Sequence, residues 1–506
     1  MDSRADNNKR LVKNTVALYC RTAIVMVVSL IVTRYLLKIL GEEDYGVYNV
    51  VAGVVVLFTF LNASMTQAIQ RFLTVSLGKD DNNEFRRVFS MSIITQLMMI
   101  IGLIVLSEAI GVWFLNCKLK IDPERLVAAN WVFQLSILTF SINFLRTPYE
   151  SSVIAYEKMS FFAYASIVDA VLKLAIVFML SISPIDKLVS YAVLLLIESL
   201  LMFLVYRFYC RYKFENCRFK YQMDRKLMVE LLSFSGWSIC GSTTSILTQN
   251  GVLFLLNYYV SLVANAAMGV ANQVGTAVNT FIASFQTSFR PQIVKAYAQN
   301  DSSYLNSLIT RTSKISFIMV FIPTILIIIN APLILQIWLT EVPDYTVSFC
   351  RLLLVCCIID AVTGPYNCAV MATGEIRNYQ LAISVSFVLD FVLCWIFLSG
   401  GMSAHYILIF RILTRGILNM CFGLYYMQKQ IGFNIKDYIV AVLKPIAIFL
   451  VLFSPLTIAN VVYFKGWSLF FTSCAYCCVI GGLMSYYIVL DASERNYLLS
   501  LIKRKK

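Results

Sequence analysis

The stretch TRYLLKILGEEDYGVYNVVAG, residues 33–53, decides the fold class. A long apolar run ends with Arg34 and Lys38, three acids and a glycine interrupt it, and a second apolar run follows at once. A membrane-spanning helix needs roughly 20 apolar residues. The pattern therefore predicts two membrane helices joined by the short turn 41–46. Gly41 would end the first helix, and Gly46 would let the second pack closely.

The same alternation of long apolar runs and short polar breaks continues along the chain. Of the 506 residues, 59% are hydrophobic and only 14% are charged, and the mean hydropathy is +0.74. A soluble domain cannot cover that much apolar surface. We predict an all-α polytopic membrane protein with about 14 transmembrane helices. The expected spans are 12–40, 44–73, 87–115, 126–148, 159–182, 188–209, 228–259, 264–289, 311–336, 346–372, 379–398, 404–427, 438–458 and 467–490.

The placement of the basic residues predicts the orientation. An even number of spans puts both termini on one side, and most Lys and Arg then gather in the termini and loops of that side, above all in residues 206–226. The positive-inside rule makes that side cytoplasmic. The net charge of +14 is then a topology signal, and nucleic acid is not expected as a partner. The basic residues in or beside outer loops are Lys38, Lys118, Lys120, Arg125, Lys187 and Lys465.

An internal repeat divides the chain. GVYNVVAG (46–53) overlays GVANQVGT (269–276) with four identical positions, and the neighbouring loops agree in composition. We predict two six-helix lobes, 1–215 and 216–430, around a central cavity, followed in 431–506 by two extra helices and a basic cytoplasmic tail. Parallel repeats of this kind are a transporter architecture with alternating access. A duplicated bundle without a transport path is the alternative.

Charged residues inside the spans need an explanation, because each raises the free energy of membrane insertion by about 2.5–3.5 kcal/mol at the centre of a helix. Asp169 and Lys173 are four residues apart and predict a local ion pair. Arg411 and Arg415 have the same spacing but the same sign, so they need an acidic partner, water or an anionic ligand. Arg21 lies deeper in the first span than Arg34 and Lys38, which share one face. Arg146, near an expected inner helix end, is predicted to extend its charge to the interface.

Polar residues form a stripe in the span 264–289. Asn265, Asn272, Thr276 and Asn279 are spaced to lie on one helical face. Such a stripe must face protein or water, so it is either a packing surface between helices or the wall of a hydrated path.

Two acids in later spans are candidates for ion coupling. Asp360 precedes Gly364 and Pro365, which predict a bend, and Asp390 lies one span further on. Either acid could equally be the partner of Arg411 or Arg415.

Several chemistries lack the residues they need. His405 is the single histidine, there is no GxxxxGK[ST] motif, and no loop is large enough for a catalytic domain. The run CAYCC (474–478) has zinc-like spacing but lies in the last span without a second ligand pair. We therefore expect neither an enzyme nor a metal or other cofactor.

The opening stretch resembles a known signature. TRYLLKILGEEDYGVY (33–48) is similar to the N-terminal part of Wzx-type polysaccharide flippases for O-antigen or capsule repeat units. These belong to the multidrug/oligosaccharidyl-lipid/polysaccharide (MOP) exporter superfamily. RTPYESSVIAYEKMSFFAYASI (146–167) resembles the fourth and fifth helices of that family.

This resemblance implies a flippase that moves an undecaprenyl-pyrophosphate-linked oligosaccharide from the cytoplasmic to the outer leaflet of the bilayer, in association with the polysaccharide polymerase machinery. A pyrophosphate is anionic and suits bidentate arginine contacts. The substrate-binding candidates are Arg21, Arg34, Lys38, Arg411 and Arg415 for the pyrophosphate, and Asn272, Thr276 and Asn279 for the sugars.

Four alternatives stay open at this point. A peptidoglycan-precursor flippase has a similar architecture, and a cation-coupled multidrug exporter of the same superfamily would use the acidic residues. A glycan polymerase or ligase would need a large catalytic outer loop, which the chain lacks. A scaffold without transport would not need charges in mid-membrane.

Overall fold

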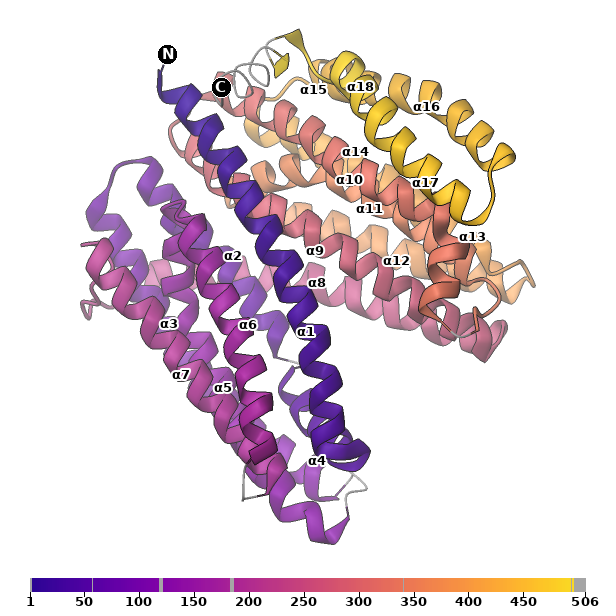
Figure 1. The fold of residues 1–506 in the computed structure, drawn as a ribbon. Coiled ribbons are helices and arrows are strands. Elements are labelled where there is room, and N and C mark those ends of the chain that lie inside the picture. Colours follow the sequence, from indigo (N-terminus) through magenta and orange to yellow (C-terminus); the bar gives the residue numbers. More distant parts are fainter. Residues whose placement is uncertain are drawn as a thin grey trace. The chain divides into compact units, whose positions relative to one another are not determined.

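The computed structural model describes residues 2–56, 58–117, 122–182, 186–339, 341–492 and 494–495. Within these ranges every regular element is helical (Figure 1), which confirms the predicted fold class. The basic tail predicted at the C-terminus falls mostly outside them, as do Lys118 and Lys120.

The helices follow one another with short connections. Their bounds are α1 (Asp2–Val56), α2 (Thr59–Gly78), α3 (Asn82–Leu106), α4 (Val112–Cys117), α5 (Pro123–Ala155), α6 (Met159–Ile182), α7 (Lys187–Lys213), α8 (Arg225–Tyr259), α9 (Leu262–Ala298), α10 (Ser302–Trp338), α11 (Thr346–Thr373), α12 (Arg377–Ser399), α13 (His405–Arg411), α14 (Asn419–Ile431), α15 (Ile435–Tyr438), α16 (Lys444–Tyr463), α17 (Gly466–Tyr476) and α18 (Gly482–Met484). Short π-helical segments interrupt several of them at Ser107–Gly111, Ile412–Leu418, Ile439–Leu443, Cys477–Gly481 and Ser485–Val489.

Twelve helices in the described part of the chain are long and apolar enough to cross a membrane. The expected span 44–73 extends across residue 57, which lies outside the described ranges, and the expected span 264–289 does not meet this criterion. They correspond to the end of α1 with α2, and to α9. The predicted internal repeat relates these two expected spans.

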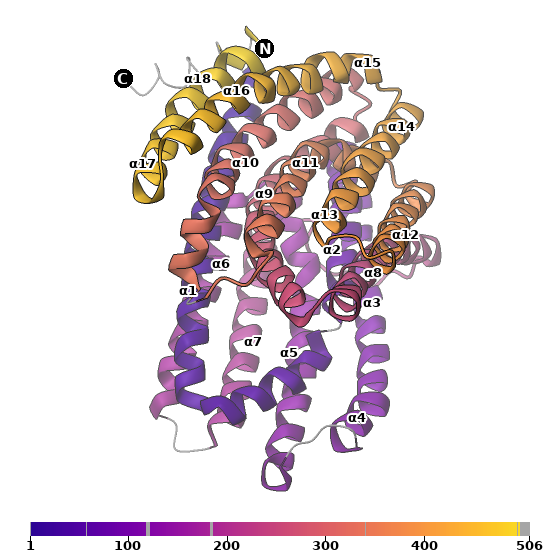
Figure 2. The ribbon, with the colours of Figure 1, turned by 90° about the vertical axis from the view of Figure 1, so that its right-hand side faces the viewer.

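The turn after the first span is a single break in the helix. α1 contains Gly41 at φ 79° and ψ 173°, a conformation that is essentially restricted to glycine. Figure 2 shows the chain changing direction near the end of α1. Gly41 thus ends the first span as predicted. The close packing expected at Gly46 is wrong for the described residues, because an added Cβ there would meet no atom of theirs within 4 Å.

One arginine holds the residues after this break in place. Arg125, at the start of α5, places Nη2 2.8 Å from Oδ2 of Asp44 and also pairs with Asp186. Asp186 in turn accepts backbone N–H bonds from the first turn of α7. Three elements are therefore tied at one point by complementary charges and a helix cap.

The chain forms two compact units. Unit 1 comprises residues 1–239 and 287–299, and unit 2 comprises 240–286 and 300–506. In unit 1, α1 packs on α6 and α5 on α7, and Leu36, Val177 and Leu180 share one apolar cluster. In unit 2, α10 packs on α11. Because α8 and α9 each contribute to both units, the predicted lobe boundaries at 215/216 and 430/431 stay predictions.

A buried lysine anchors the end of the last span to α10 within unit 2. Lys314 of α10 is 0% exposed, and its Nζ lies 2.6 Å from Oδ2 of Asp491 and 3.5 Å from Oε2 of Glu494. A fully buried ammonium is tolerated only with such partners. The pairing fixes the end of the C-terminal segment against α10.

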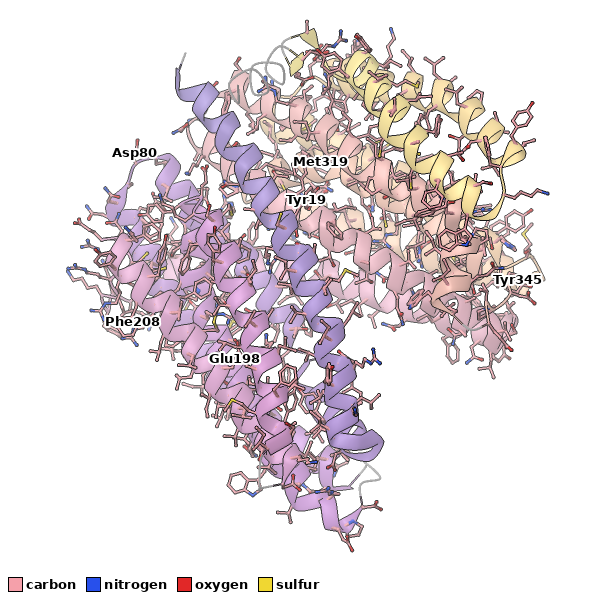
Figure 3. The ribbon with its side chains drawn as sticks, viewed as in Figure 1. Tyr19, Asp80, Glu198, Phe208, Met319 and Tyr345 are labelled. Atoms are coloured by element: carbon pink, nitrogen blue, oxygen red, sulfur yellow. The ribbon has the colours of Figure 1, made fainter. Side chains whose placement is uncertain are left out.

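Large apolar side chains are exposed along many spans. Phe208 of α7 is 65% exposed and is labelled on the outer side of unit 1 in Figure 3. A soluble protein rarely leaves so much apolar surface open to water. This exposure fits a surface that faces lipid.

Candidate functional site

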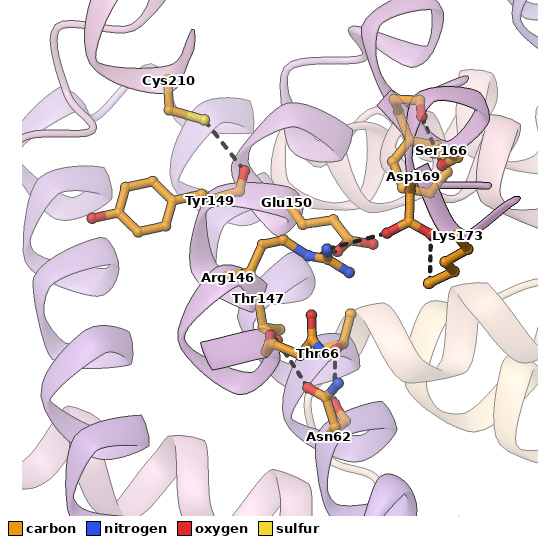
Figure 4. Close-up of polar contacts among 12 residues, drawn as sticks. Asn62, Thr66, Arg146, Thr147, Tyr149, Glu150, Ser166, Asp169, Lys173 and Cys210 are labelled. Atoms are coloured by element: carbon orange, nitrogen blue, oxygen red, sulfur yellow. Dashed lines mark hydrogen bonds and ion pairs between the residues drawn. The ribbon is translucent and has the colours of Figure 1, made fainter. Parts of the chain in front are cut away.

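A network of charged side chains lies within the candidate spans of unit 1. Arg146 of α5 places Nε 3.7 Å from Oε2 of Glu150 and Nη1 3.7 Å from Oδ1 of Asp169. Lys173 of α6 places Nζ 2.6 Å from Oδ2 of the same Asp169, and Figure 4 shows these residues together. The predicted Asp169–Lys173 ion pair is confirmed. Arg146, whose charge is predicted to extend to the interface, lies between two carboxylates.

Two residues of α7 complete this network. Glu198 is 5% exposed and lies beside Asp169. The guanidinium carbon of Arg146 stands 5.7 Å from the ring centroid of Tyr206. Three neighbouring helices thus contribute both signs of charge to one region, which lowers the cost of keeping each charge in the span.

Unlike Arg146 and Lys173, Arg21 of α1 forms no ion pair with another described residue. Its guanidinium carbon lies 5.0 Å from the ring centroid of Phe162, and it is near enough to Glu150 for an electrostatic interaction. Its Nε is buried, yet it donates to no hydrogen-bond acceptor among the described residues. Burying such a donor without a partner is unfavourable. Arg21 therefore retains hydrogen-bonding capacity for a ligand.

Arg34 and Lys38 lie further along the same span of α1. Both side chains are exposed, and no described residue forms an ion pair with either. They are separated from Arg21 by more than three helical turns at 3.6 residues per turn. These residues therefore form a second, more open group of positive charge.

In unit 2 the predicted acidic partner of the arginine pair is present. Arg411, 4% exposed, places Nε 3.5 Å from Oδ2 of Asp390, which is 0% exposed. Asp390 belongs to α12 and Arg411 ends α13. Since both charges are removed from solvent, each depends on the other.

Arg415 has a different environment from Arg411. It lies in the π-helical segment Ile412–Leu418, is half-buried, and places its guanidinium carbon 4.9 Å from the ring centroid of Phe387. Asp360 of α11 interacts with it electrostatically. Insertions of this kind in α-helices are frequent at functional sites. Arg415 thus forms no ion pair with another described residue, whereas Arg411 pairs with Asp390.

The polar stripe of α9 is open on its own unit. Thr276 and Asn279 are exposed and Asn272 is half-buried. The Thr276 hydroxyl donates to the carbonyl oxygen of Asn272 at 2.8 Å, within the helix. No hydrogen bond joins these three side chains to another helix of the described chain. Their placement favours a hydrated surface over packing between helices.

The bend predicted after Asp360 is accompanied by a tight contact. Pro365 lies inside α11, which continues to Thr373. A Cβ on Gly364 would lie 2.2 Å from Nε2 of Gln286. Glycine at this position leaves room for the side chain of Gln286 from α9.

The structure brings some sequence candidates together and leaves others apart. Arg21 joins a network, and Arg411 joins Asp390. Arg146 and Glu150 were missed as candidates, although their spacing of four residues is the same signal that identified Asp169 and Lys173.

Comparisons with known proteins show the family and the fold. The sequence model of a family described as polysaccharide biosynthesis protein matches residues 11–297. A search of curated proteins gave no match.

Solved transporter structures have the same fold. An outward-facing multidrug resistance MATE family transporter of the MOP superfamily has a TM-score of 0.74 at 13% identity, over 84% of this chain and 96% of that one. A MATE structure in the straight conformation gives the same values. A MOP superfamily transporter from Pyrococcus furiosus has a TM-score of 0.71 at 13% identity, over 83% of this chain and 97% of that one.

Identities this low support the fold alone, whereas the sequence match extends over more than half of the chain. The resemblance to the MOP superfamily is confirmed at that level. The protein belongs to the polysaccharide biosynthesis protein family and has the fold of the MOP superfamily transporters.

Proposed function

We propose that this protein flips an undecaprenyl-pyrophosphate-linked oligosaccharide repeat unit across the bacterial inner membrane, with both termini in the cytoplasm. The headgroup would cross by alternating access, and the polysaccharide polymerase machinery would use the exported unit. Family membership supports the link to surface polysaccharide. The observation that carries the proposal is the buried Nε of Arg21, which has no partner among the described residues although it lies inside a membrane span.

Arg21 would contact the pyrophosphate, and other basic residues would follow along its path. An arginine binds phosphate oxygens through two parallel N–H bonds, which a lysine cannot reproduce. Arg34, Lys38 and Arg415 remain candidates for the same group. Arg411 would act through Asp390, because the two side chains already satisfy each other. Asn272, Thr276 and Asn279 offer amides and a hydroxyl for sugar hydroxyls.

An exporter of cationic drugs is the second candidate within this fold. Such a site would use free carboxylates. Asp390 is engaged by Arg411 and Asp169 by Lys173, which supports the anionic substrate instead. One similar structure is described as having a binding pocket of reverse polarity that suggests a different function, so this fold is compatible with pockets of different charge. Asp360 stays the candidate for ion coupling, and Asp390 would take part only if its pair with Arg411 opened.

The test is export of the glycan by charge variants in a strain that depends on this protein. We expect Arg21→Ala to lower export by roughly tenfold or more, because one charge-assisted contact contributes about 1.5–3 kcal/mol. Arg21→Lys should retain part of the activity, since it keeps the charge but not the bidentate geometry. Export is measured as surface glycan at equal amounts of membrane protein.

Lys429→Ala is the matched control, because it removes an exposed positive charge on α14 and should export normally. The same variants should behave alike in vesicles that contain the purified protein and an undecaprenyl-pyrophosphate glycan. Normal export by Arg21→Ala at normal protein level would exclude the assigned role. A change in resistance to cationic drugs without a change in glycan export would favour the second candidate.

A further inference from the structure

Unit 1 contains a polar cavity at the ends of α3 and α8 that are predicted to be cytoplasmic. Its volume is about 580 Å³, and it lies between the first turns of α3 and α8 and the segment that precedes α8. Its lining includes Arg86, Arg87, Lys220, Lys226 and Glu230. None of these residues belongs to the charged network in the spans.

The acids around this cavity are already engaged. Asp81 accepts the backbone N–H bonds of Asn83 and Glu84 at 3.0 and 2.9 Å and so caps α3. Asp224 forms an ion pair with Arg87. The Leu227 N–H bond to Asp224 and the nearby Arg87 hold the pKa of the Asp224 carboxyl below its usual value. Neither carboxylate forms an ion pair with Arg86, Lys220 or Lys226.

Three basic residues of the lining have no such partner. Arg86, Lys220 and Lys226 form no ion pair with any residue in the described ranges, and the Nε of Arg86 is buried without a hydrogen-bond acceptor. The other two lining carboxylates interact with basic residues outside the lining: Oε2 of Glu84 lies 3.8 Å from Nζ of Lys79, and Glu230 interacts electrostatically with Arg71. Three basic side chains of the lining are thus left without an ion pair among the described residues.

The segment that carries Lys220 is held in place on α3. The Lys220 N–H donates to Oγ of Ser90 at 3.1 Å, and the Asp224 N–H lies 3.2 Å from Sδ of Met91. The cavity wall is therefore a defined part of the fold.

Apolar side chains alternate with the basic ones along this segment. Phe219, Tyr221 and Met223 are all exposed beside the cavity. Aromatic residues at this kind of position are typical of the boundary between membrane and water. Their exposure next to basic side chains that form no ion pair with a described residue indicates that the cavity opens at a lipid surface.

We propose that this cavity binds the phosphate of an anionic phospholipid headgroup. Basic pockets between membrane helices on the cytoplasmic side suit such headgroups, and arginine matches phosphate geometry. Arg86, Lys220 and Lys226 bind the phosphate oxygens. The exposed apolar side chains of the segment contact the acyl chains.

The test measures lipid binding to the purified full-length protein in detergent. Phosphatidylglycerol, phosphatidylcholine and inorganic phosphate are titrated separately, and binding is followed by native mass spectrometry and by the shift of the thermal midpoint. We expect wild-type protein to prefer phosphatidylglycerol over the other two. Lys220→Gln/Lys226→Gln should weaken that binding roughly thirtyfold, since each basic residue contributes about 1 kcal/mol at a lipid surface.

The control is Lys429→Gln/Lys436→Gln, which removes two exposed positive charges from unit 2 and should leave binding unchanged. Arg86→Gln extends the test to the partly buried member, and the lysine double variant covers the case in which Arg86→Gln fails to fold. Equal binding of phosphatidylglycerol and phosphatidylcholine would overturn the proposal. Unchanged binding by the lysine variant, or tighter binding of inorganic phosphate than of lipid, would also overturn it. Glycan export is not part of this readout, so the result is independent of the proposed transport function.

Discussion

At the scale of single residues, the charges inside the spans have two different roles. Asp169 engages Arg146 and Lys173, and Asp390 engages Arg411. These groups stabilise the contacts between helices and leave little capacity for a ligand. Arg21 instead forms no ion pair with another described residue, and its buried Nε has no hydrogen-bond acceptor there. A negatively charged ligand could therefore bind Arg21 without breaking an existing ion pair. At Arg411 it would have to displace the carboxylate of Asp390.

The Asp390–Arg411 pair gives a prediction that does not depend on transport. Arg411→Gln leaves the Asp390 carboxylate buried and unpaired, which should destabilise the protein by about 3–5 kcal/mol. The double variant Asp390→Asn/Arg411→Gln carries neither charge and should recover much of that loss. The thermal midpoint of the purified protein measures both effects. A double variant that is no more stable than the single one would show that the pairing of opposite charges is not what stabilises this contact.

At the scale of elements, alanine substitutions at two glycines five residues apart are predicted to have opposite effects on stability. Gly41 has φ 79° and ψ 173°, so Gly41→Ala should destabilise unit 1 by about 1–3 kcal/mol. Gly46 is helical and has open space at its Cβ position. Gly46→Ala should therefore be neutral or stabilise the helix by about 0.5–1 kcal/mol.

Thermal unfolding and the amount of protein in the membrane check the two glycine variants side by side. A Gly41→Ala protein as stable as the Gly46→Ala protein would contradict this interpretation. In that case the break in α1 would tolerate a side chain, and the glycine would not be what ends the first span.

The sequence predicts helices and the spacing of residues along a helix better than it predicts which residues of different helices form ion pairs. Residues four apart share a helical face, so the Asp169–Lys173 pair follows directly from the sequence. An apolar window gives the approximate depth of Arg146 but not which neighbouring helix it faces, so Asp169 could not be identified as its partner. The π-helical segment Ile412–Leu418 changes the register between Arg411 and Arg415, and regular helical spacing does not reveal such a change.

At the scale of the whole molecule, twelve of the fourteen predicted spans are helices in the described ranges that are long and apolar enough to cross a membrane. α9 is more polar and carries Asn272, Thr276 and Asn279 in its sequence. A helix that is too polar for lipid can remain in a membrane where protein or water covers its polar face. Water at the exposed face of α9 would satisfy this requirement.

The predicted orientation of all these spans can be tested with reporter fusions along the chain. Alkaline phosphatase is active only outside the cytoplasm, and green fluorescent protein fluoresces only inside it. The positive-inside rule predicts phosphatase activity for fusions after Gly400 and Lys465. It predicts fluorescence for fusions after Gln222 and Gly432. Each site receives both reporters, so that every fusion has its own control. The reverse pattern at all four sites would invert the orientation, and with it the direction of the proposed export. A loss of alternation between Gly400 and Gly432 would mean that the helix between them, residues 405–431, does not cross the membrane.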